Sequence, residues 1–354
     1  MQNKDIFCLG VMSGTSLDGL DVAYVRINSN NYVDFAIIEA ITIPYSNKWK
    51  TDLRNAINFS KEELSILDIE YGKLLGEEIL SFIENFSIER IDFIASHGHT
   101  VFHQPDKGIT LQIGSGQKIA NITKQRVVCD FRTQDVKFGG QGAPLVPIGD
   151  QLLFSNYGYC INLGGFANIS FEENNQRVAF DVCPVNIVMN HYCRKLNLEY
   201  DDEGKIAAKG NINYELLERL NGLDFYEKKY PKSLGLEWVQ SSIFPLIDEM
   251  ESDVPIILRT FVEHIAIQIH NILLVDSLIL VTGGGAFNKF LLKRIEILSE
   301  KRVVTPTNML INYKEALIFA FLGVLKLKNE VNCLKSVTGA KEDHSSGVIF
   351  IPEK

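Results

Sequence analysis

The chain has 354 residues, of which 46% are hydrophobic and 22% are charged. This balance is typical of a globular protein with enough apolar side chains for two or three domains. The formal net charge of −9 argues against a nucleic acid or an anionic membrane as a partner. The six cysteines form no Cys-x-x-Cys pair, no leader-like segment precedes the first apolar run, and no apolar run reaches the ~18 residues of a membrane span. We therefore expect a cytoplasmic protein with reduced thiols.

The first predicted elements are strands over residues 6–11 and 22–27, separated by a loop of small and polar residues. Glycines let a loop backbone approach an anion, hydroxyl groups donate hydrogen bonds, and carboxylates can hold a hydrated metal ion. This composition predicts a loop that binds the phosphates of a nucleotide, although a plain hairpin turn has the same composition. The residues concerned are Ser13, Gly14, Thr15, Ser16, Asp18, Gly19 and Asp21.

A capping box over residues 60–63 begins the next predicted element, a helix whose apolar residues recur with a period near 3.6 as far as Ile83. A buried strand is expected over residues 91–95, ending at the polar run 96–100. Another strand is expected over residues 126–129.

Three histidines, His97, His99 and His103, follow the strand at 91–95. A zinc site needs four ligands, or three with an open position, and no cysteine or further histidine lies nearby in the sequence. We therefore predict uncharged imidazoles that hydrogen-bond a polyhydroxylated ligand. For His99, a polar loop without a ligand is an equally simple interpretation.

Arg132 begins a polar, glycine-rich segment that includes residues 139–147. Its guanidinium can bind a carboxylate or phosphate of a ligand through two parallel hydrogen bonds. The alternative is an internal ion pair with Asp130 or Asp135.

The pattern of strand, glycine turn and strand returns over residues 159–170, with the turn at Gly164 and Gly165. A short strand over 178–181 then ends on Asp181. Side chains at strand ends project into the clefts of α/β proteins, so this carboxylate is a candidate general base. A helix-capping or loop aspartate is the alternative.

A third glycine turn, residues 283–285, lies between a predicted strand at 278–282 and a predicted helix at 289–298. Its spacing is not Gly-x-Gly-x-x-Gly, and no acidic residue ends a following strand, so a dinucleotide-binding fold is disfavoured. Flat glycine backbone can instead lie against an adenine or a ribose. The chain thus contains two copies of an arrangement of strand, hairpin and helix. This suggests two α/β lobes whose glycine turns face a common cleft.

Together these segments resemble the anhydro-N-acetylmuramic acid kinase family, sugar kinases of the actin/hexokinase superfamily. The matching segments follow one another through nearly the whole chain. They are residues 10–21, 96–100, 112–114, 130–132, 139–147, 162–169, 180–181, 200–201, 282–288 and 314–316, with His103, Pro105, Gly204 and Gly210.

The resemblance implies an α/β, two-lobed, actin-like (ribonuclease H-like) fold with ATP bound between the lobes. The expected lobes are residues 1–132 with 332–354, and residues 133–331. The implied enzyme hydrolyses the 1,6-anhydro ring of anhydro-N-acetylmuramic acid and phosphorylates O6 with ATP and Mg²⁺. The products are N-acetylmuramate 6-phosphate and ADP, formed in peptidoglycan recycling. The resemblance also favours a homodimer.

The resemblance further assigns roles to residues. Asp181 corresponds to the base that activates water, and Glu315 is a weaker catalytic candidate. Asp18 is the expected Mg²⁺ ligand. The expected phosphate loop is Gly14, Thr15, Ser16, Leu17, Asp18, Gly19, Leu20 and Asp21, with Gly164, Gly165 and Asn168 as a second phosphate contact. Gly283, Gly284, Gly285 and Asn288 would face the nucleoside, and His97, Arg132, Gly142, Ala143 and Pro144 the sugar.

The chain departs from the family pattern beside the expected base. The family usually continues with Thr-Gly-Pro-Gly-Asn, whereas this chain has Val182-Cys183-Pro184-Val185-Asn186, and His99 stands where the family usually has Gln. Because a hydroxyl donor and two glycines are lost, an altered sugar preference, slow turnover or a lost activity stays open. The alternatives are a non-catalytic sensor that binds a cell-wall sugar or nucleotide, and a kinase for another sugar or acid. A nicotinamide-dependent dehydrogenase is the least favoured.

Overall fold

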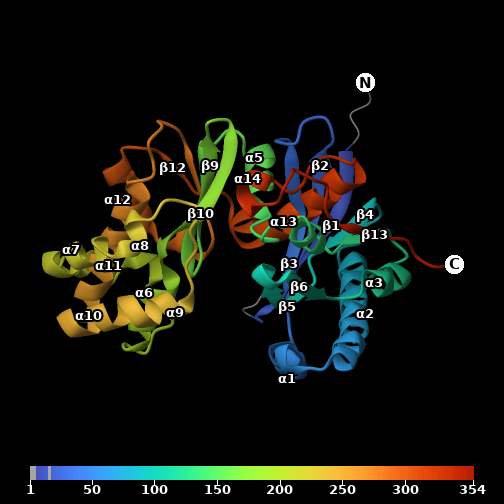
Figure 1. The fold of residues 1–354 in the computed structure, drawn as a ribbon, viewed down its shortest axis with the longest axis horizontal. Helices are drawn as coiled ribbons and strands as arrows, with labels where there is room; N and C mark the ends of the chain where they lie inside the picture. The colour runs from blue at the N-terminus through green and yellow to red at the C-terminus, as the bar shows by residue number, and fades with distance from the viewer. Residues whose placement is uncertain (1–4, 15–16) are drawn as a thin grey trace. The chain divides into compact units, whose positions relative to one another are not determined.

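The computed structural model describes residues 5–14 and 17–354, which divide into two compact units (Figure 1). Unit 1 comprises Met1–Phe154 and Tyr313–Lys354, and unit 2 comprises Ser155–Asn312. The chain therefore passes between the units twice.

Unit 1 is built on a six-stranded sheet with the order β13-β7-β4-β1-β2-β3. The first three strands form an antiparallel meander, and β4 and β7 then run parallel to β1. The short strand β13 pairs antiparallel with β7 at the edge. The bounds are β1 Asp5–Ser13, β2 Gly19–Asn28, β3 Phe35–Pro44, β4 Phe93–Ser96, β7 Val127–Cys129 and β13 Val348–Phe350.

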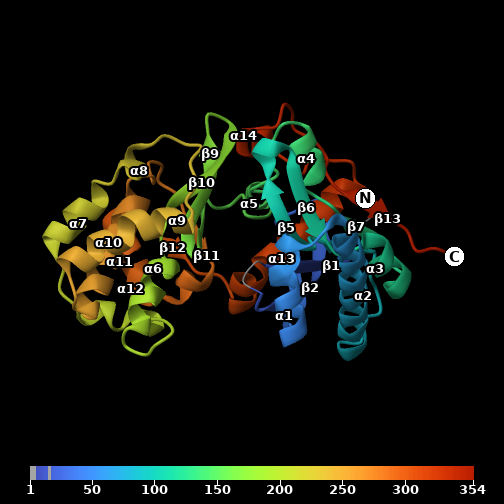
Figure 2. The ribbon, with the colours of Figure 1, turned by 60° about the horizontal axis from the view of Figure 1, so that its bottom comes forward.

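Helices cover both faces of this sheet, because β1 is apolar on both sides. Leu9 and Val11 join a core formed with α2 and α3, which lie side by side in Figures 1 and 2. Gly10 faces α13 (Asn308–Leu327) so closely that a Cβ would lie 1.9 Å from the Ala316 carbonyl oxygen. The elements of unit 1 outside the sheet are α1 Asn47–Asn55, α2 Lys61–Asn85, α3 Gly116–Thr123, α4 Thr133–Lys137, α5 Val146–Leu153, α14 Lys335–Thr338 and the hairpin β5 His99–Gln104 and β6 Ile109–Ile113.

Unit 2 contains a five-stranded sheet with the order β10-β9-β8-β11-β12. Strands β8, β9 and β10 form an antiparallel meander, and β11 and β12 run parallel to β8. The strands are β8 Tyr159–Leu163, β9 Phe166–Glu173, β10 Gln176–Pro184, β11 Ile279–Thr282 and β12 Val303–Val304. The helices are α6 Asn186–Arg194, α7 Tyr214–Asn221, α8 Asp224–Glu227, α9 Leu236–Trp238, α10 Phe244–Met250, α11 Val254–His270 and α12 Lys289–Ser299.

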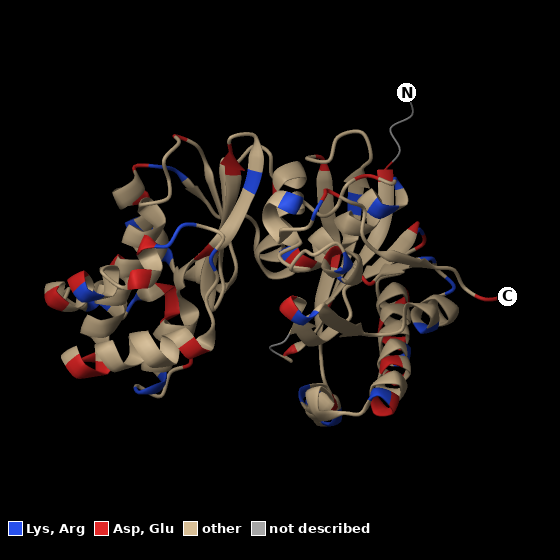
Figure 3. Ribbon diagram, in the orientation of Figure 1, with Lys and Arg blue, Asp and Glu red and all other residues tan. Residues whose placement is uncertain are grey.

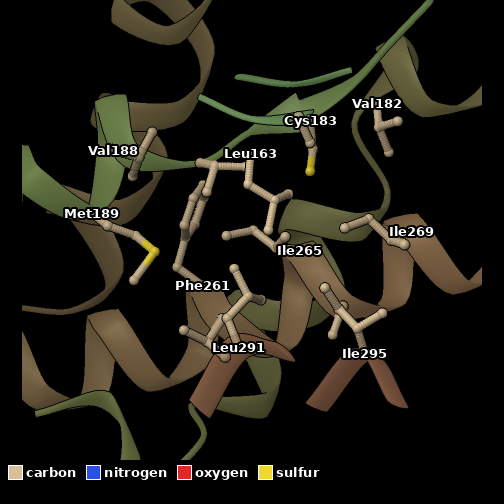
Figure 4. Close-up of a cluster of buried hydrophobic side chains, with 14 of the residues drawn as sticks. Leu163, Val182, Cys183, Val188, Met189, Phe261, Ile265, Ile269, Leu291 and Ile295 are labelled. Atoms are coloured by element: carbon tan, nitrogen blue, oxygen red, sulfur yellow. The ribbon is translucent and has the colours of Figure 1, made fainter. Parts of the chain in front are cut away.

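One face of the unit 2 sheet packs on helices. Figure 4 shows Leu163 and Cys183 of the sheet against Phe261 and Ile265 of α11 and Leu291 of α12, all of them buried. Because side chains alternate along a strand, the residues between these apolar positions face the other way. The polar residues of the site lie on that other face.

Five strands have the same arrangement in both sheets. The first three form an antiparallel meander, and the other two continue the sheet beyond the first strand of the meander and run parallel to it. The duplication confirms the predicted α/β, two-lobed, actin-like fold class. The units divide the chain at 154/155 and 312/313, whereas the expected lobes divided it at 132/133 and 331/332. Packing agrees with this division: Gly149 of α5 lies against Ile318 of α13 (Asn308–Leu327), and α5 and the part of α13 from Tyr313 onward belong to unit 1.

Other local predictions agree with the structure. The capping box at α2 forms, with the Ser60 backbone N–H donating to Glu63 at 2.7 Å and the Glu63 N–H donating to the Ser60 hydroxyl at 3.2 Å. All six cysteines are free and buried. Acidic and basic residues are interspersed over both units (Figure 3). Within residues 5–14 and 17–354, every helix is too short or too polar to traverse a lipid bilayer.

Candidate functional site

The expected phosphate loop of unit 1 is the turn of the β1–β2 hairpin, since Ser13 pairs with Leu20 and Met12 with Asp21. The hairpin interpretation is therefore correct for the strands on either side of the loop. Leu17, at a φ of 60°, and Leu20 are anchored in the core. Two of the expected contacts, Thr15 and Ser16, lie outside the described residues.

A buried hydroxyl network supports the start of this loop. Ser13 Oγ lies 3.3 Å from His99 Nδ1 and accepts a hydrogen bond from the Tyr45 hydroxyl at 2.8 Å. The Tyr45 hydroxyl is 2.6 Å from that of Tyr71. Burial lowers the pKa of His99 to about 4, so its ring is neutral at pH 7. The role that the structure gives His99 is to hold the loop, and a ligand contact for it stays a prediction.

Two carboxylates of the loop lie close enough to affect each other. Burial raises the pKa of Asp21, a hydrogen bond from the Thr42 hydroxyl (2.6 Å) lowers it, and the charge of exposed Asp18 raises it again. A pair of neighbouring carboxylates beside a hydroxyl is an oxygen donor set, which suits a hard cation such as Mg²⁺. The residues present therefore fit the expected metal.

Arg132 lies between His97 and the glycine-rich segment. Its Nε donates to His97 Nε2 at 3.0 Å, and its Nη1 donates to the Gly142 carbonyl at 2.6 Å. His97 Nδ1 lies 2.9 Å from the Gly98 carbonyl, so this nitrogen carries the proton and Nε2 accepts. Burial, and then the charge of Arg132, lower the pKa of His97 to about 3. The imidazole is thus neutral, as the sequence predicted.

The two aspartates that were alternative partners of Arg132 are occupied elsewhere. Asp130 Oδ1 accepts from the Thr133 N–H at 3.3 Å. Asp135 accepts from the Gly142 N–H at 2.7 Å and from the Thr338 hydroxyl at 2.7 Å. Asp135 therefore shapes the segment around Gly142, and the guanidinium is oriented by His97 and Gly142.

Glu315 belongs to unit 1, like Arg132 and Asp21, and its charge interacts with theirs. Its side chain has exposed surface but is densely surrounded by protein, which raises the pKa of its carboxyl. The charge of Arg132 lowers that pKa and the charge of Asp21 raises it, so Glu315 lies near both. The next residue toward the N-terminus, Lys314, forms a buried ion pair with Asp150 at 2.7 Å.

In unit 2, a row of polar residues crosses the sheet beside the glycine turns. Asp181 on β10 pairs with Asn168 on β9, which pairs with Asn162 on β8, which in turn pairs with Thr282 on β11. Register partners in neighbouring strands lie side by side on one face. Asn168 is exposed and Asp181 half-buried, so this part of the row can meet a ligand.

Asp181 is held by the segment that follows α8. Its Oδ2 accepts from the Leu234 N–H at 2.8 Å, and its own N–H donates to the Lys232 carbonyl at 3.1 Å. Burial raises the pKa of its carboxyl, and the Leu234 hydrogen bond opposes this rise. A raised pKa makes the carboxylate a stronger base than an exposed aspartate, which suits a group that must accept a proton.

These pKa shifts predict the acidic limb of the rate profile. A base works only when it is deprotonated, so kcat/KM is expected to fall as the pH drops through the raised pKa of Asp181, above the usual value of 3.8. His97, neutral above about pH 3, contributes nothing to this limb. The variant His97→Asn is therefore expected to keep the wild-type midpoint of kcat/KM against pH. A midpoint displaced in that variant would contradict the assignment.

The departure from the family pattern lies in the core. A β-bulge separates Asp181 from Cys183, and the side chains of Val182, Cys183 and Val185 are buried (Figure 4 labels the first two). The backbone of Val185 still reaches the turn, donating to the Gly165 carbonyl at 2.8 Å. The substituted side chains are therefore part of the hydrophobic core of unit 2.

The expected nucleoside loop packs directly on the end of β8. At Gly283, with a φ of 80°, a Cβ would lie 2.7 Å from Asn162 Oδ1, and at Gly285 a Cβ would lie 2.6 Å from Leu163 Cβ. The turn at Gly283 therefore lies against the end of β8 that leads into the turn at Gly164. Asn288 is buried and caps α12 by accepting from the Leu291 N–H at 3.0 Å. A nucleoside contact by Asn288 stays a prediction.

A cavity of about 460 Å³ in unit 2 is a separate feature. Phe180 and Val182 line it, and they flank Asp181 on the strand, so the cavity opens on the opposite face of the sheet. Its wall includes Lys232, whose carbonyl binds the Asp181 N–H. The cavity is therefore behind the polar row and does not contain the carboxylate.

The structure thus forms two groups of the predicted residues, one in each unit. Unit 1 brings together His97, Arg132 and Gly142, with Asp21 and Glu315 near them. Unit 2 brings together Asn168, Asp181 and the two glycine turns. Sequence reasoning missed Ser13 as an anchor, Thr42 as the partner of Asp21, and Asn162 with Thr282 in the polar row. The signal for the last two was the strand alternation, which places them on the face of Asp181.

The family model and the curated relatives agree with the resemblance. Residues 6–352 match the family model described as anhydro-N-acetylmuramic acid kinase. A curated relative of that name from Pseudomonas savastanoi pv. phaseolicola is 33% identical over 98% of this chain and 99% of its own length. One from Vibrio cholerae is 32% identical over 100% of both chains. Among solved structures, a ROK family glucokinase from Streptomyces griseus in complex with glucose and AMPPNP has 12% identity and a TM-score of 0.41, covering 89% of this chain and 98% of that one.

Proposed function

The chain belongs to the anhydro-N-acetylmuramic acid kinase family, and we propose that it phosphorylates O6 of 1,6-anhydro-N-acetylmuramic acid with ATP while water opens the anhydro ring. The products are N-acetylmuramate 6-phosphate and ADP. The observation that carries the proposal is the full-length match to the family. We assign the role of the base to Asp181 from the resemblance of the residues around it. The half-buried carboxylate with a raised pKa supports that role.

The chemistry balances around Asp181. Water attacks C1 of the sugar, its proton passes to the carboxylate, and the bond between C1 and O6 breaks. The freed O6 attacks the γ-phosphorus of ATP, and ADP leaves. Such phosphoryl transfer depends mainly on positioning and on neutralisation of charge. Mg²⁺, held by Asp18 and Asp21, would supply part of that neutralisation when bound.

The remaining residues position the sugar and the nucleotide. Arg132 would present its charged guanidinium to the sugar beside Gly142, Ala143 and Pro144. Neutral His97 orients this guanidinium, since both of its ring nitrogens are already engaged by Arg132 and the Gly98 carbonyl. The lactyl carboxylate of the substrate is the natural partner for a guanidinium. The backbone at residues 14–21, the turn at Gly164 and the turn at Gly283 are proposed to contact ATP.

Two further properties belong to the proposal. A cytoplasmic location follows from the need for ATP and from the recycling role, and localisation of a tagged protein tests it. A homodimer is expected from the resemblance, and sedimentation of the purified protein tests it.

Isotope labelling tests the reaction. We expect that incubation with ATP, Mg²⁺ and the anhydro sugar in ¹⁸O-labelled water places one ¹⁸O at C1 of the product and none in its phosphate. Samples should be quenched early and compared with unlabelled product kept in the labelled water, because a reducing sugar exchanges its C1 oxygen. Label in inorganic phosphate alone would indicate simple ATP hydrolysis and contradict the proposal.

A substrate panel separates the alternatives that the residues beside Asp181 leave open. Turnover of the anhydro sugar at about 1–100 s⁻¹, the range usual for kinases, excludes a non-catalytic sensor. Binding of the sugar without ADP release supports the sensor. Phosphorylation of another sugar or acid without addition of water supports a kinase of different specificity.

A further inference from the structure

A second cluster of chemically active side chains lies in unit 1, behind the segment that binds Arg132. It consists of Asp135 on α4, Cys333 after α13 and His344 near the C-terminus, each of them buried. One ligand atom from each residue lies within 4.8 Å of the other two. Three segments distant in the sequence thus place an oxygen, a sulfur and a nitrogen around one point.

The imidazole of His344 is turned toward that point. Its Nδ1 lies 3.1 Å from the Glu342 carbonyl oxygen, which can only accept, so Nδ1 carries a proton. Its Nε2 lies 3.5 Å from Asp135 Oδ1, and among the described residues it has no hydrogen-bond partner. The side chain is 5% exposed, so water does not readily satisfy this nitrogen. Two electron-rich atoms therefore face each other inside the protein.

We propose that Asp135, Cys333 and His344 bind a zinc ion. The nitrogen, sulfur and carboxylate oxygen are the ligand types of zinc sites, and a water molecule would occupy the fourth position. Ligand atoms about 2.0–2.1 Å from a tetrahedral zinc ion lie roughly 3.3–3.4 Å apart. The observed separation of 3.5 Å between Nε2 and Oδ1 is close to that value. A doubly charged ion also balances one carboxylate and one thiolate.

The hydrogen bonds and contacts around His344 and Asp135 are those expected around the ligands of a metal ion. A zinc-bound histidine usually donates its other N–H to a carbonyl, as His344 does to Glu342. The ring of His344 is packed edge-on against Phe138, with centroids 4.9 Å apart, which fixes its orientation. The Thr338 hydroxyl donates to Asp135 Oδ1 at 2.7 Å, which orients the carboxylate.

The position of the site suggests its effect. The second oxygen of Asp135 binds the Gly142 N–H, and the Gly142 carbonyl binds Arg132. A zinc ion on Asp135 would therefore fasten the C-terminal segment to the loop that orients Arg132. The site goes beyond the proposed kinase activity and is independent of it.

Metal analysis of tag-free, full-length protein tests the inference. We expect wild-type protein, stripped with a chelator and dialysed against Zn²⁺, to retain one zinc per chain. Cys333→Ser and His344→Gln should each weaken zinc binding by more than about tenfold. Cys193→Ser, which removes another buried free cysteine, is the matched control and should bind zinc like the wild type. Cobalt(II) should give a thiolate charge-transfer band in wild-type protein and none in Cys333→Ser.

The outcomes decide whether the cluster binds zinc. If the wild type retains no zinc, or if both variants retain it fully, the inference is wrong. If Cys333→Ser does not fold, the cobalt spectrum of the wild type still decides, because a spectrum without thiolate ligation overturns the site. Thermal unfolding with and without Zn²⁺ gives a readout that does not depend on catalysis.

Discussion

Asp181→Asn is expected to lower kcat by about 10²–10⁴-fold, the usual contribution of a general base, while KM for the anhydro sugar changes little. The amide cannot accept the proton of the attacking water, so the sugar binds but its anhydro ring is not opened. Its oxygen can still accept from the Leu234 N–H, which keeps the strand end in place. Steady-state assay of ADP release with the anhydro sugar measures the effect.

The matched control is Asp276→Asn, which changes an exposed aspartate of the same unit and should leave kcat unaltered. Stability provides a second check. A raised pKa means that the fold disfavours the charged form of Asp181, so this group destabilises the protein at pH values above its pKa. Asp181→Asn should therefore be at least as stable as the wild type at pH 7. Undiminished turnover would remove Asp181 from the mechanism.

Much of the fold was predictable because its signals are local. The strand at β1, the capped helix α2 and the strand–turn–helix around Gly283 each follow from neighbouring residues alone. The resemblance then placed these pieces in a two-lobed, actin-like fold, and the duplicated sheet order agrees with it. The division at 154/155 was not predictable, because it rests on contacts between residues far apart in the sequence, such as Gly149 with Ile318.

The site shows the same limit. The sequence suggested that His97 and Arg132 are functional and that the imidazole is uncharged. It did not show that Arg132 donates to this ring or that the charge of Arg132 helps to lower its pKa. The residue types at Val182 and Cys183 also suggested altered chemistry beside the base, but the sequence did not show that both side chains are buried in the hydrophobic core. The cluster at Cys333 and His344 gave no sequence signal at all, since its three residues share no spacing pattern. Such features depend on tertiary contacts that no short window of sequence contains.

Arg132→Ala is expected to lower kcat/KM by about 10²-fold. A hydrogen bond to a charged group contributes roughly 1.5–3 kcal/mol, which corresponds to about 10–150-fold in kcat/KM. The truncation also leaves His97 Nε2 and the Gly142 carbonyl without the donor that the guanidinium provides. Arg132→Lys retains the charge, but a single ammonium cannot reproduce the planar fork, so about a tenfold loss is expected. Arg54→Ala, on exposed α1 surface of the same unit, is the control and should match the wild type.

The coupling between Arg132 and His97 separates a substrate contact from a merely structural role. If the pair acts as one unit on the sugar, the double variant His97→Asn with Arg132→Ala should lose little more than Arg132→Ala alone, because neighbouring groups are not additive. Thermal unfolding must be measured alongside, since a loss of activity that follows a loss of fold carries no information about binding. A substrate analogue without the lactyl carboxylate completes the cycle: it should be turned over slowly by the wild type and suffer little further loss in Arg132→Ala. If the analogue and the natural sugar lose the same factor on truncation, Arg132 does not bind that carboxylate.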